Sequence, residues 1–340
     1  MPAPSGRVDG KRGISLPADH AAHDEFAVEW WYYTGIIKDD AGADYAFHVA
    51  FFKSWAGKEK RFGIPVRWFG NPCQFAQAAV TDLSTGRRYV KEVIGSRRLG
   101  TAGATTDRLM VWTGKWVAFD RGAGQPCVRV DLGGVELDIE LEPVKPWTLH
   151  GKPGMEPASR SYYMSSTRMS VKGTLKRNGS LSKITGTGWA DHEMMGPDVA
   201  RGADGWDWFA LQLDDGSELV HYAPRHLDGS APKRGMTVRI DQRGVRHVLK
   251  PGACRVEPTE HWTSPRSGVR FPVGWRLNIP PWGVDCNLAA AFKDGELYGR
   301  FSQIRYWEGL VRVAGRKNGR PLSGHGYVEL TGYDRPLRNF

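Results

Sequence analysis

The sequence has few cysteines and no long apolar run. Its four cysteines lie far apart in the 340 residues and form no Cys-x-x-Cys pair, which argues against a zinc knuckle or a disulfide framework and predicts buried free thiols. No segment approaches the length of a membrane-spanning helix, and the N-terminus lacks the apolar stretch of a signal peptide. We therefore expect a cytoplasmic protein, and contact with a membrane surface stays open.

Helical periodicity and nucleotide-binding motifs are also scarce. Only residues 89–99 are compatible with a short helix. No Gly-x-Gly-x-x-Gly, phosphate-binding loop or Gly-x-Ser-x-Gly string occurs. These absences argue against α/β folds that bind nucleotides at crossover connections.

The sequence instead carries the pattern of antiparallel β-hairpins. Residues 135–141 alternate aliphatic and acidic side chains, which predicts a strand with one buried face and one solvated face. We therefore predict an all-β protein. Hairpin turn dipeptides are expected at Gly133-Gly134, Asn178-Gly179, Asp215-Gly216, Asp294-Gly295 and Asn318-Gly319.

The length predicts two domains, because 340 residues exceed what one hydrophobic core normally serves. The short strands are too numerous for one eight-stranded barrel and suit two closed or nearly closed barrels. We place the domains at 1–200 and 201–340, with the junction in the loop 194–204. The Pro/Gly-rich segment 143–160 is either a lid at a barrel mouth or a plain surface connection.

The basic residues do not form a nucleic-acid-binding pattern. A net charge of +10 permits attraction to anions, but the lysines and arginines are scattered, without a recognition helix or an RNA-binding signature. We interpret them as a solvated surface and expect no nucleic-acid partner. No heptad or apolar edge suggests a symmetric interface, so a monomer is expected.

Three dense segments, 29–35, 189–193 and 205–214, combine aromatic rings with carboxylates. As strands, each would sort its side chains onto two faces. The predicted groups are Glu29, Trp31 and Tyr33 in the first segment, Trp189, Asp191 and Glu193 in the second, with His192 opposite, and Trp206, Trp208 and Gln212 in the third.

Strings in and around these segments carry a family resemblance. They are EWWYYTG, GTGWADHE, GWDWFALQLDDGSELVHYAPR, and RYWEGLVRVAG with GHGYVELTGY, spread from about Asp19 to Tyr333. They resemble the carotenoid 1,2-hydratase and AttH-like family of lipocalin-like proteins, whose members include kievitone hydratase and fungal lipocalin-like enzymes of Diels-Alder cyclisation. The resemblance implies two tandem lipocalin-like antiparallel β-barrel domains, with a ligand pocket at or between them.

One departure from the family pattern concerns the predicted pocket. The family's Asp-His-Glu-Trp-Gly string reads DHEMMG at residues 191–196, so the flexible, polarisable Met194 replaces an aromatic ring. We expect Met194 to line a pocket of altered shape.

A mechanism follows from the carboxylates. Adding water to an isolated alkene requires a strong proton donor, and a carboxylic acid kept neutral by an apolar pocket can be that donor. We predict Asp191 as the donor, Glu193 as the group that holds water or shares the proton, and His192 as an orienting or proton-passing group. The rings of Trp31, Tyr33, Trp206 and Trp208 would shield the cation by about 0.5–2 kcal/mol each. The predicted substrate-binding residues are Glu29, Trp31, Tyr33, Trp189, Met194, Trp206, Trp208, Gln212 and His221.

A structural interpretation of the same residues stands beside this one. An Asp-His-Glu string can tie domains together through hydrogen bonds, and tryptophans commonly plug barrel ends. A zinc site built from His192, Glu193 and His221 is rejected, since the spacing matches no recognised ligand set. We expect neither a metal nor a cofactor.

Three functions remain open. The first is an enzyme of isoprenoid or polyene metabolism, in the manner of carotenoid or terpenoid biosynthesis, that protonates an alkene and leads to hydration or cation-driven cyclisation. The second is a pericyclase that only folds a polyene into a reactive shape. The third is a non-catalytic carrier of a lipophilic ligand. Carboxylates within the aromatic segments favour catalysis, because a carrier needs few of them.

Overall fold

The computed structural model describes residues 4–55, 60–61, 64–65, 70–122, 124–151, 154–156, 161–196, 203–227 and 235–337. Over these residues the chain forms antiparallel β-strands and two single 3-10 turns, Ala18–His20 and Pro280–Trp282, without an α-helix. No helix within these ranges is long and apolar enough to cross a membrane. The prediction of an all-β chain is confirmed.

Contacts within the chain divide it into two units, which we describe separately. Unit 1 comprises residues 1–199 with 299–303, and unit 2 comprises residues 200–298 with 304–339. Most of the predicted junction loop 194–204 lies outside the described residues. The described part of segment 143–160 contains two short strands, which pair with a longer strand of unit 1.

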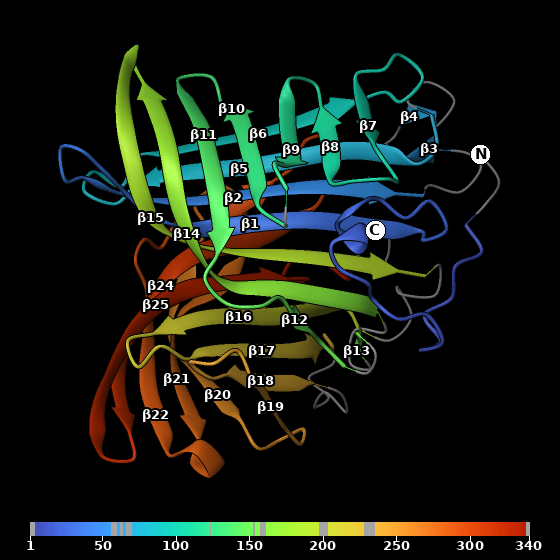
Figure 1. Ribbon diagram of the computed structural model, residues 1–340. Coiled ribbons are helices and arrows are strands. Elements are labelled where there is room, and N and C mark those ends of the chain that lie inside the picture. Colours follow the sequence, from blue (N-terminus) through green and yellow to red (C-terminus); the bar gives the residue numbers. More distant parts are fainter. Residues whose placement is uncertain are drawn as a thin grey trace. The chain divides into compact units, whose positions relative to one another are not determined.

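Unit 1 is a long antiparallel sheet that curls into a nearly closed barrel (Figure 1). The strand order is β6-β5-β2-β1-β15-β14-β11-β10-β9-β8-β7, with β12 and β13 paired to β14. Because β6 and β7 are consecutive in the chain, both ends of this path meet at one turn. The bounds are β1 (Val28–Asp39), β2 (Asp44–Ser54), β5 (Cys73–Asp82), β6 (Arg88–Gly95), β7 (Ala102–Ala104), β8 (Met110–Thr113), β9 (Trp116–Asp120), β10 (Pro126–Asp131), β11 (Val135–Pro143), β12 (Thr148–Leu149), β13 (Met155–Glu156), β14 (Ser161–Arg177) and β15 (Ser180–Met195), beside a small hairpin of β3 (Lys60–Arg61) and β4 (Ile64–Pro65).

Unit 2 is a second antiparallel sheet of the half-barrel kind. Its strand order is β19-β18-β17-β16-β25-β24-β22-β21-β20, with β23 paired to β24. The bounds are β16 (Gly205–Leu213), β17 (Glu218–Arg225), β18 (Met236–Ile240), β19 (Arg246–Leu249), β20 (Arg255–Thr263), β21 (Arg270–Ile279), β22 (Val284–Ala290), β23 (Glu296–Tyr298), β24 (Arg305–Lys317) and β25 (Arg320–Thr331).

The short helix considered for residues 89–99 is wrong. Residues 88–95 form β6, in which Val90 pairs with Ala79 of β5 and Ile94 pairs with Phe75. The β-branched residues of this stretch suit a pleated surface, and pairing with a buried neighbour outweighs a weak helical pattern.

The predicted turns are mostly hairpins. Gly133-Gly134, Asn178-Gly179, Asp215-Gly216 and Asn318-Gly319 each join two directly paired strands. Asn178 and Gly179 both have positive φ, 50° and 84°, as the tightest hairpin turn requires. Asp294-Gly295 differs: it leads from β22 into β23, and these strands both pair with β24 instead of with each other.

The cysteines are free thiols, as predicted. Cys73, Cys127 and Cys286 are buried, whereas Cys254 is only partly buried. Burial raises the pKa of Cys254 to about 12, which keeps this thiol protonated. The Cys254 thiol is therefore unreactive, because the thiolate is the reactive form.

The two faces of the unit 1 sheet have different roles. The face that carries Trp31, Tyr33, Phe47, Val49 and Phe51 packs the hydrophobic core of the unit, and we call it the inner face. The opposite side of the same strands is the outer face. Side-chain alternation along β1 and β2 produces this division, because every second residue points inward.

Gly35 provides a test of the packing on the inner face. A Cβ atom there would lie 2.7 Å from Cε1 of Phe47 and would also press on the carbonyl oxygen of Thr187. We expect Gly35→Ala to lower the free energy of unfolding by about 1–3 kcal/mol, as overpacking does. Gly13→Ala, which meets open space, is the matched control, and equal effects of the two substitutions in urea titrations would contradict this packing.

Candidate functional site

Strand β15 carries a buried polar network on each of its two faces. Directly paired residues of antiparallel strands share a face. His192 pairs with Trp31 and lies on the inner face. Asp191 pairs with Tyr32 of β1 and Ser165 of β14, and therefore lies on the outer face. The two networks share a strand but occupy opposite sides of the sheet.

The outer network is built around the carboxylate of Asp191. Ser165 Oγ and Trp189 Nε1 donate hydrogen bonds to Oδ1, over 2.5 and 2.7 Å, and the hydroxyl of Tyr163 donates to Oδ2 over 2.9 Å. Only 6% of Asp191 is exposed. Among the described residues no lysine or arginine pairs with it. A carboxylate in such a place is held by neutral dipoles alone, which disfavours its charged form.

Burial raises the pKa of Asp191 to about 7, although its three hydrogen bonds act in the opposite direction. The group therefore exists as both acid and carboxylate near neutral pH, which is the range that suits general acid–base catalysis. Asp207 of unit 2 offers a contrast. Burial raises the pKa of Asp207 as well, but Arg225 forms an ion pair with it over 3.0 Å and counters the effect.

The raised pKa of Asp191 predicts a pH dependence of stability. Since the folded chain holds the proton more tightly than the unfolded chain, the unfolded state is favoured as the pH rises from about 4 to about 7. Relative to Asp191→Asn, which stays neutral, the wild type should lose stability across that window, by about 4 kcal/mol at most. Denaturant titrations of both proteins at pH 5 and pH 8 measure the difference. A difference that does not change with pH would contradict the shift.

His150 adds a second layer to the outer network. Its Nε2 lies 2.9 Å from Ser165 Oγ, and its ring stacks on Tyr163 with the centroids 4.2 Å apart. His150 and Ser165 are both completely buried. Glu193, further along β15, accepts a hydrogen bond from Ser161. Ser165 and Tyr163, which donate hydrogen bonds to Asp191, are thus themselves contacted by His150.

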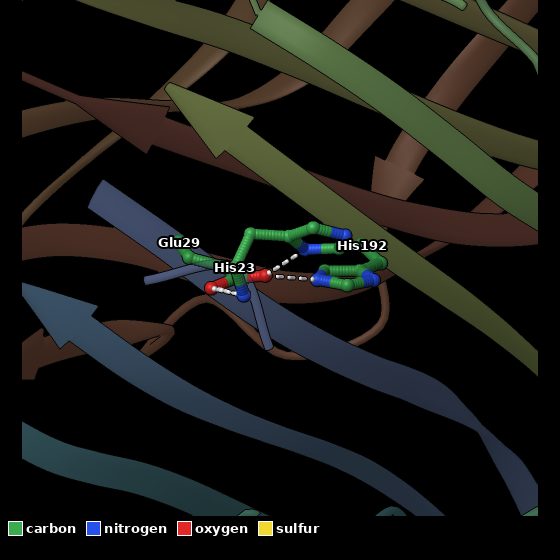
Figure 2. Close-up of side chains that lie close together, drawn as sticks. All are labelled: His23, Glu29 and His192. Atoms are coloured by element: carbon green, nitrogen blue, oxygen red, sulfur yellow. Dashed lines mark hydrogen bonds and ion pairs between the residues drawn. The ribbon is translucent and has the colours of Figure 1, made fainter. Parts of the chain in front are cut away.

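The inner network centres on Glu29, as Figure 2 shows. His23 Nδ1 and His192 Nε2 approach Oε1 of Glu29 to 2.8 and 2.9 Å, and Lys53 Nζ lies 2.6 Å from Oε2. Glu29 and Lys53 are both completely buried. Burial alone would raise the pKa of Glu29, but Lys53 and the two histidines hold it well below its usual value. Glu29 is therefore an ionised, structural carboxylate, unlike Asp191.

The N-terminal segment completes the inner network. His23 Nε2 lies 2.9 Å from Oδ1 of Asp19, and Arg12 Nη2 lies 2.6 Å from the same oxygen. Burial would lower the pKa of His23, yet the hydrogen bonds to Glu29 and Asp19 raise it overall, which favours an imidazolium that donates from both nitrogens. Burial lowers the pKa of His192, so this ring is neutral and donates from Nε2. Each of the two carboxylates, Asp19 and Glu29, is thus paired with cationic groups.

A metal ion fits this cluster poorly. One ligand atom each from His23, Glu29 and His192 lie within 4.8 Å of one another. The ammonium of Lys53 already pairs with Glu29, however, and it would repel a divalent cation. The zinc set considered from the sequence is not assembled either, because His192 and Glu193 point to opposite faces of β15.

Trp31 and Tyr33 do not share a face of the sheet with Asp191. Both rings lie on the inner face, where Trp31 stacks on His192 with centroids 4.8 Å apart. The rings of β1 that share the outer face with Asp191 are those of Trp30 and Tyr32. Tyr32 pairs directly with Asp191. A role of Trp31, Tyr33 and Glu29 in substrate binding stays a prediction. To contact them, a substrate would have to bind on the inner face.

Met194, which replaces an aromatic ring of the family pattern, also lies on the inner face. It pairs with Glu29 of β1 and is completely buried against Phe26 and Tyr162. Its sulfur lies 3.9 Å from Nη1 of Arg12. The thioether thus packs beneath the N-terminal segment, and its contact with a substrate stays a prediction.

The remaining predicted residues lie in unit 2. Trp206, Trp208 and Gln212 share the face of β16 opposite to the hydrophobic core of that unit, and Trp206 Nε1 donates to Glu329 over 2.5 Å. His221 differs, because it pairs with the core residue Phe209, and burial lowers its pKa to about 4. Substrate contacts of these four residues stay predictions.

Several members of the two networks were not predicted from the sequence. Lys53 follows Val49 and Phe51 at alternate positions, so strand periodicity alone would have placed its side chain inside. His23, His150 and Ser165 lie outside the three aromatic segments and carry no comparable signal. Their places follow from the pairing of β14 with β15 and from the course of the N-terminal segment.

A cavity of about 180 Å³ lies at the other end of β1 and β15. Its lining includes Asp39, Tyr45, Arg177 and Ser180, and none of the predicted site residues. Arg177 is paired with Asp82 over 2.6 Å. This cavity therefore adds nothing to the chemistry of Asp191.

The two curled antiparallel sheets define a lipocalin-like protein of the two-barrel class. A model of the AttH-like family matches residues 7–333, and the chain belongs to this family. The resemblance read from EWWYYTG and GTGWADHE is thereby confirmed.

Two solved structures are similar over nearly the whole chain. An AttH-like protein from Nitrosomonas europaea is 28% identical, with 96% of this chain and 99% of that protein covered and a TM-score of 0.84. Kievitone hydratase from Nectria haematococca is 15% identical, with 98% of each chain covered and a TM-score of 0.75. At that identity the second similarity concerns the fold alone. A search of curated proteins found no match.

Proposed function

We propose that the chain is an enzyme that protonates an alkene of a hydrophobic substrate, with Asp191 as the proton donor. The observation that carries this proposal is the buried carboxyl of Asp191, which, within the described part of the chain, contacts only uncharged donors. Protonating an isolated alkene creates a carbocation, so the donor must be a positioned acid that is still protonated at working pH. A carboxyl group in an apolar place keeps its proton at that pH, and it donates that proton without a cofactor.

Hydration is the reaction that we propose first. Kievitone hydratase is by name a hydratase, and it shares this fold. In hydration the O–H bond of Asp191 breaks as the new C–H bond forms, and water then adds to the cation and loses a proton. Glu193 lies on the same face two residues along β15, where it could hold that water. Capture of the cation by an internal alkene would close a ring with the same acid.

The substrate class that we propose is an isoprenoid or polyene, such as a carotenoid-like or terpenoid compound. The experiment is to incubate the purified chain with a panel of linear isoprenoids and polyenes in oxygen-18 water and to analyse the products by mass spectrometry. A product heavier than its substrate by one labelled water supports hydration. An isomer of unchanged mass that Asp191→Asn no longer makes supports acid-driven cyclisation.

Two outcomes would contradict the proposal. Isomerisation that survives in Asp191→Asn would identify a pericyclase, in which shape alone lowers the barrier. Tight retention of a panel compound without turnover would identify a carrier. Both outcomes leave the fold and the family unchanged, since neither depends on the acid.

A further inference from the structure

We propose that His23 holds the segment 12–23, which we call the strap, on unit 1 as a pH-sensitive switch: loss of one proton from its ring releases the strap from Asp19. The proposal does not rest on the proposed function. Glu29 and His192, which His23 contacts, lie on the inner face of the sheet, whereas Asp191 lies on the outer face. Failure of the switch would therefore leave the proposed acid unchanged.

The strap joins two separate parts of the unit 1 sheet. Nε1 of Trp31, in β1, donates to the carbonyl of His20 over 3.2 Å. The backbone amide of Ala22 donates over 2.8 Å to the carbonyl of Thr105, which follows β7. Because β1 and β7 are far apart in the strand order, the strap crosses the inner side of the sheet and does not extend one of its strands.

His23 is the residue at which the strap contacts two carboxylates. Its Nδ1 lies 2.8 Å from Oε1 of Glu29, and its Nε2 lies 2.9 Å from Oδ1 of Asp19. The backbone amide of His23 also donates to Oε2 of Glu29 over 3.0 Å, and its carbonyl accepts a hydrogen bond from Lys53. Figure 2 shows the ring of His23 directed at Glu29 beside His192. Only a doubly protonated ring can donate to both carboxylates.

The charged and titratable groups that face this ring belong to several elements. They are Arg12 and Asp19 of the strap, Glu29 of β1, Lys53 of β2 and His192 of β15. Burial lowers the pKa of His23, but the contacts with Glu29 and Asp19 raise it overall. The folded chain thus holds this proton more tightly than the unfolded chain. The resulting stabilisation is complete at low pH and is lost as the pH rises through the pKa of the folded state.

A neutral imidazole has one N–H, so its other nitrogen points a lone pair at a carboxylate oxygen. The two carboxylates are not equivalent in this respect. Glu29 is completely buried, whereas Asp19 already accepts hydrogen bonds from Arg12 Nη2 over 2.6 Å and from the backbone amide of Ser15 over 2.5 Å. We therefore expect Nε2 to lose its proton. Nδ1 then keeps its contact with Glu29, and the part of the strap around Asp19 separates from His23.

The test follows the ring and the strap in one titration. Full-length chain labelled with nitrogen-15 in histidine is titrated from pH 6 to pH 10 by NMR, and amide hydrogen exchange is measured over the same range and corrected for its intrinsic pH dependence. We expect Nε2 of His23 to lose its proton. At the same midpoint, the protection of amides 15–21 should fall about tenfold or more, because a charge-assisted hydrogen bond is lost. Amides 30–37 of β1 should stay equally protected.

Two variants separate the ring from other effects of pH. In His23→Asn the side-chain amide replaces Nδ1 as a donor to Glu29 but does not reach Asp19. The strap of this variant should exchange at pH 6 as fast as the wild-type strap does at pH 10, after the same correction. His247→Asn is the matched control. His247 Nε2 lies 2.9–3.0 Å-class hydrogen-bond distance from Asp241 in unit 2, at 3.0 Å, and its side chain is 40% exposed. Its removal should leave the strap unchanged.

Several results would overturn the switch. The ring could keep both protons up to pH 10, or be neutral already at pH 6. It could lose a proton while the protection of amides 15–21 stays constant, or lose it from Nδ1 instead of Nε2. An equal loss of protection in amides 30–37 would show general unfolding and would also contradict the switch. The wild-type titration decides the question even if His23→Asn does not fold, and none of these results changes the expected effect of Asp191→Asn.

Discussion

Asp191→Asn is expected to lower turnover of the alkene substrate by about 10²–10⁴-fold, the usual contribution of a positioned general acid. The amide has the shape of the carboxyl group and can accept the hydrogen bonds of Ser165 and Trp189. It has no acidic proton to give to an alkene. Substrate binding should change little, so the loss should appear in kcat and not in KM.

Two controls separate the acid from its surroundings. Asp207→Asn removes a partly buried carboxyl of unit 2 that is ion-paired with Arg225, and turnover should stay near the wild-type value. Tyr163→Phe removes one of the donors to Asp191. That change disfavours the carboxylate further, so the pH above which activity declines should move upward. Equal losses in Asp191→Asn and Asp207→Asn would show a general effect of lost structure.

Most of the fold could be predicted from local patterns. Alternation in residues 135–141 and turn pairs such as Asn178-Gly179 indicate hairpins because each satisfies a local backbone requirement. The predictions of a helix over residues 89–99 and of a hairpin turn at Asp294-Gly295 were wrong for one reason. Their strands are defined by which neighbour they pair with, and a single sequence contains no pairing information of that kind.

The site shows where sequence reasoning stops. The alternation of side chains correctly predicted that Asp191 and His192 lie on opposite faces. It also correctly predicted that Glu29 and Trp31 share a face. Joining the two segments, however, requires the register between β1 and β15, and a shift of one residue exchanges the faces. Since Asp191 pairs with Tyr32, the acid lies opposite the side that holds Trp31. The contacts of His150 likewise depend on the course of a loop.

Lys53→Met is expected to lower the free energy of unfolding by about 3–5 kcal/mol, the cost of breaking a buried ion pair from one side. Methionine matches the length of the lysine stem but leaves Glu29 with only His23 and His192 as donors. Lys53 Nζ also donates to the carbonyl of His23 over 2.5 Å, and that contact is lost. Guanidinium titrations followed by tryptophan fluorescence measure the change.

Lys38→Met is the matched control, because Lys38 pairs with Asp44 over 2.7 Å but its side chain is 56% exposed. An exposed pair contributes about 0–1 kcal/mol, so this variant should unfold almost like the wild type. If Lys53→Met lowered the free energy of unfolding as little as Lys38→Met, the ammonium of Lys53 would not be needed to stabilise the buried carboxylate of Glu29.

The double variant Lys53→Met with Glu29→Gln distinguishes lost attraction from an abandoned charge. Glu29→Gln alone leaves the buried ammonium of Lys53 without its carboxylate, so it should also cost about 3–5 kcal/mol. Removing both charges leaves no uncompensated ion, and the combined loss should fall short of the sum by about 2 kcal/mol or more. Strict additivity would contradict the pairing. The inner network lies on the face opposite to Asp191, so the double variant should retain the raised pKa of Asp191. That result would assign separate functions to the two networks. The inner network fixes the N-terminal segment, and the outer network keeps Asp191 protonated.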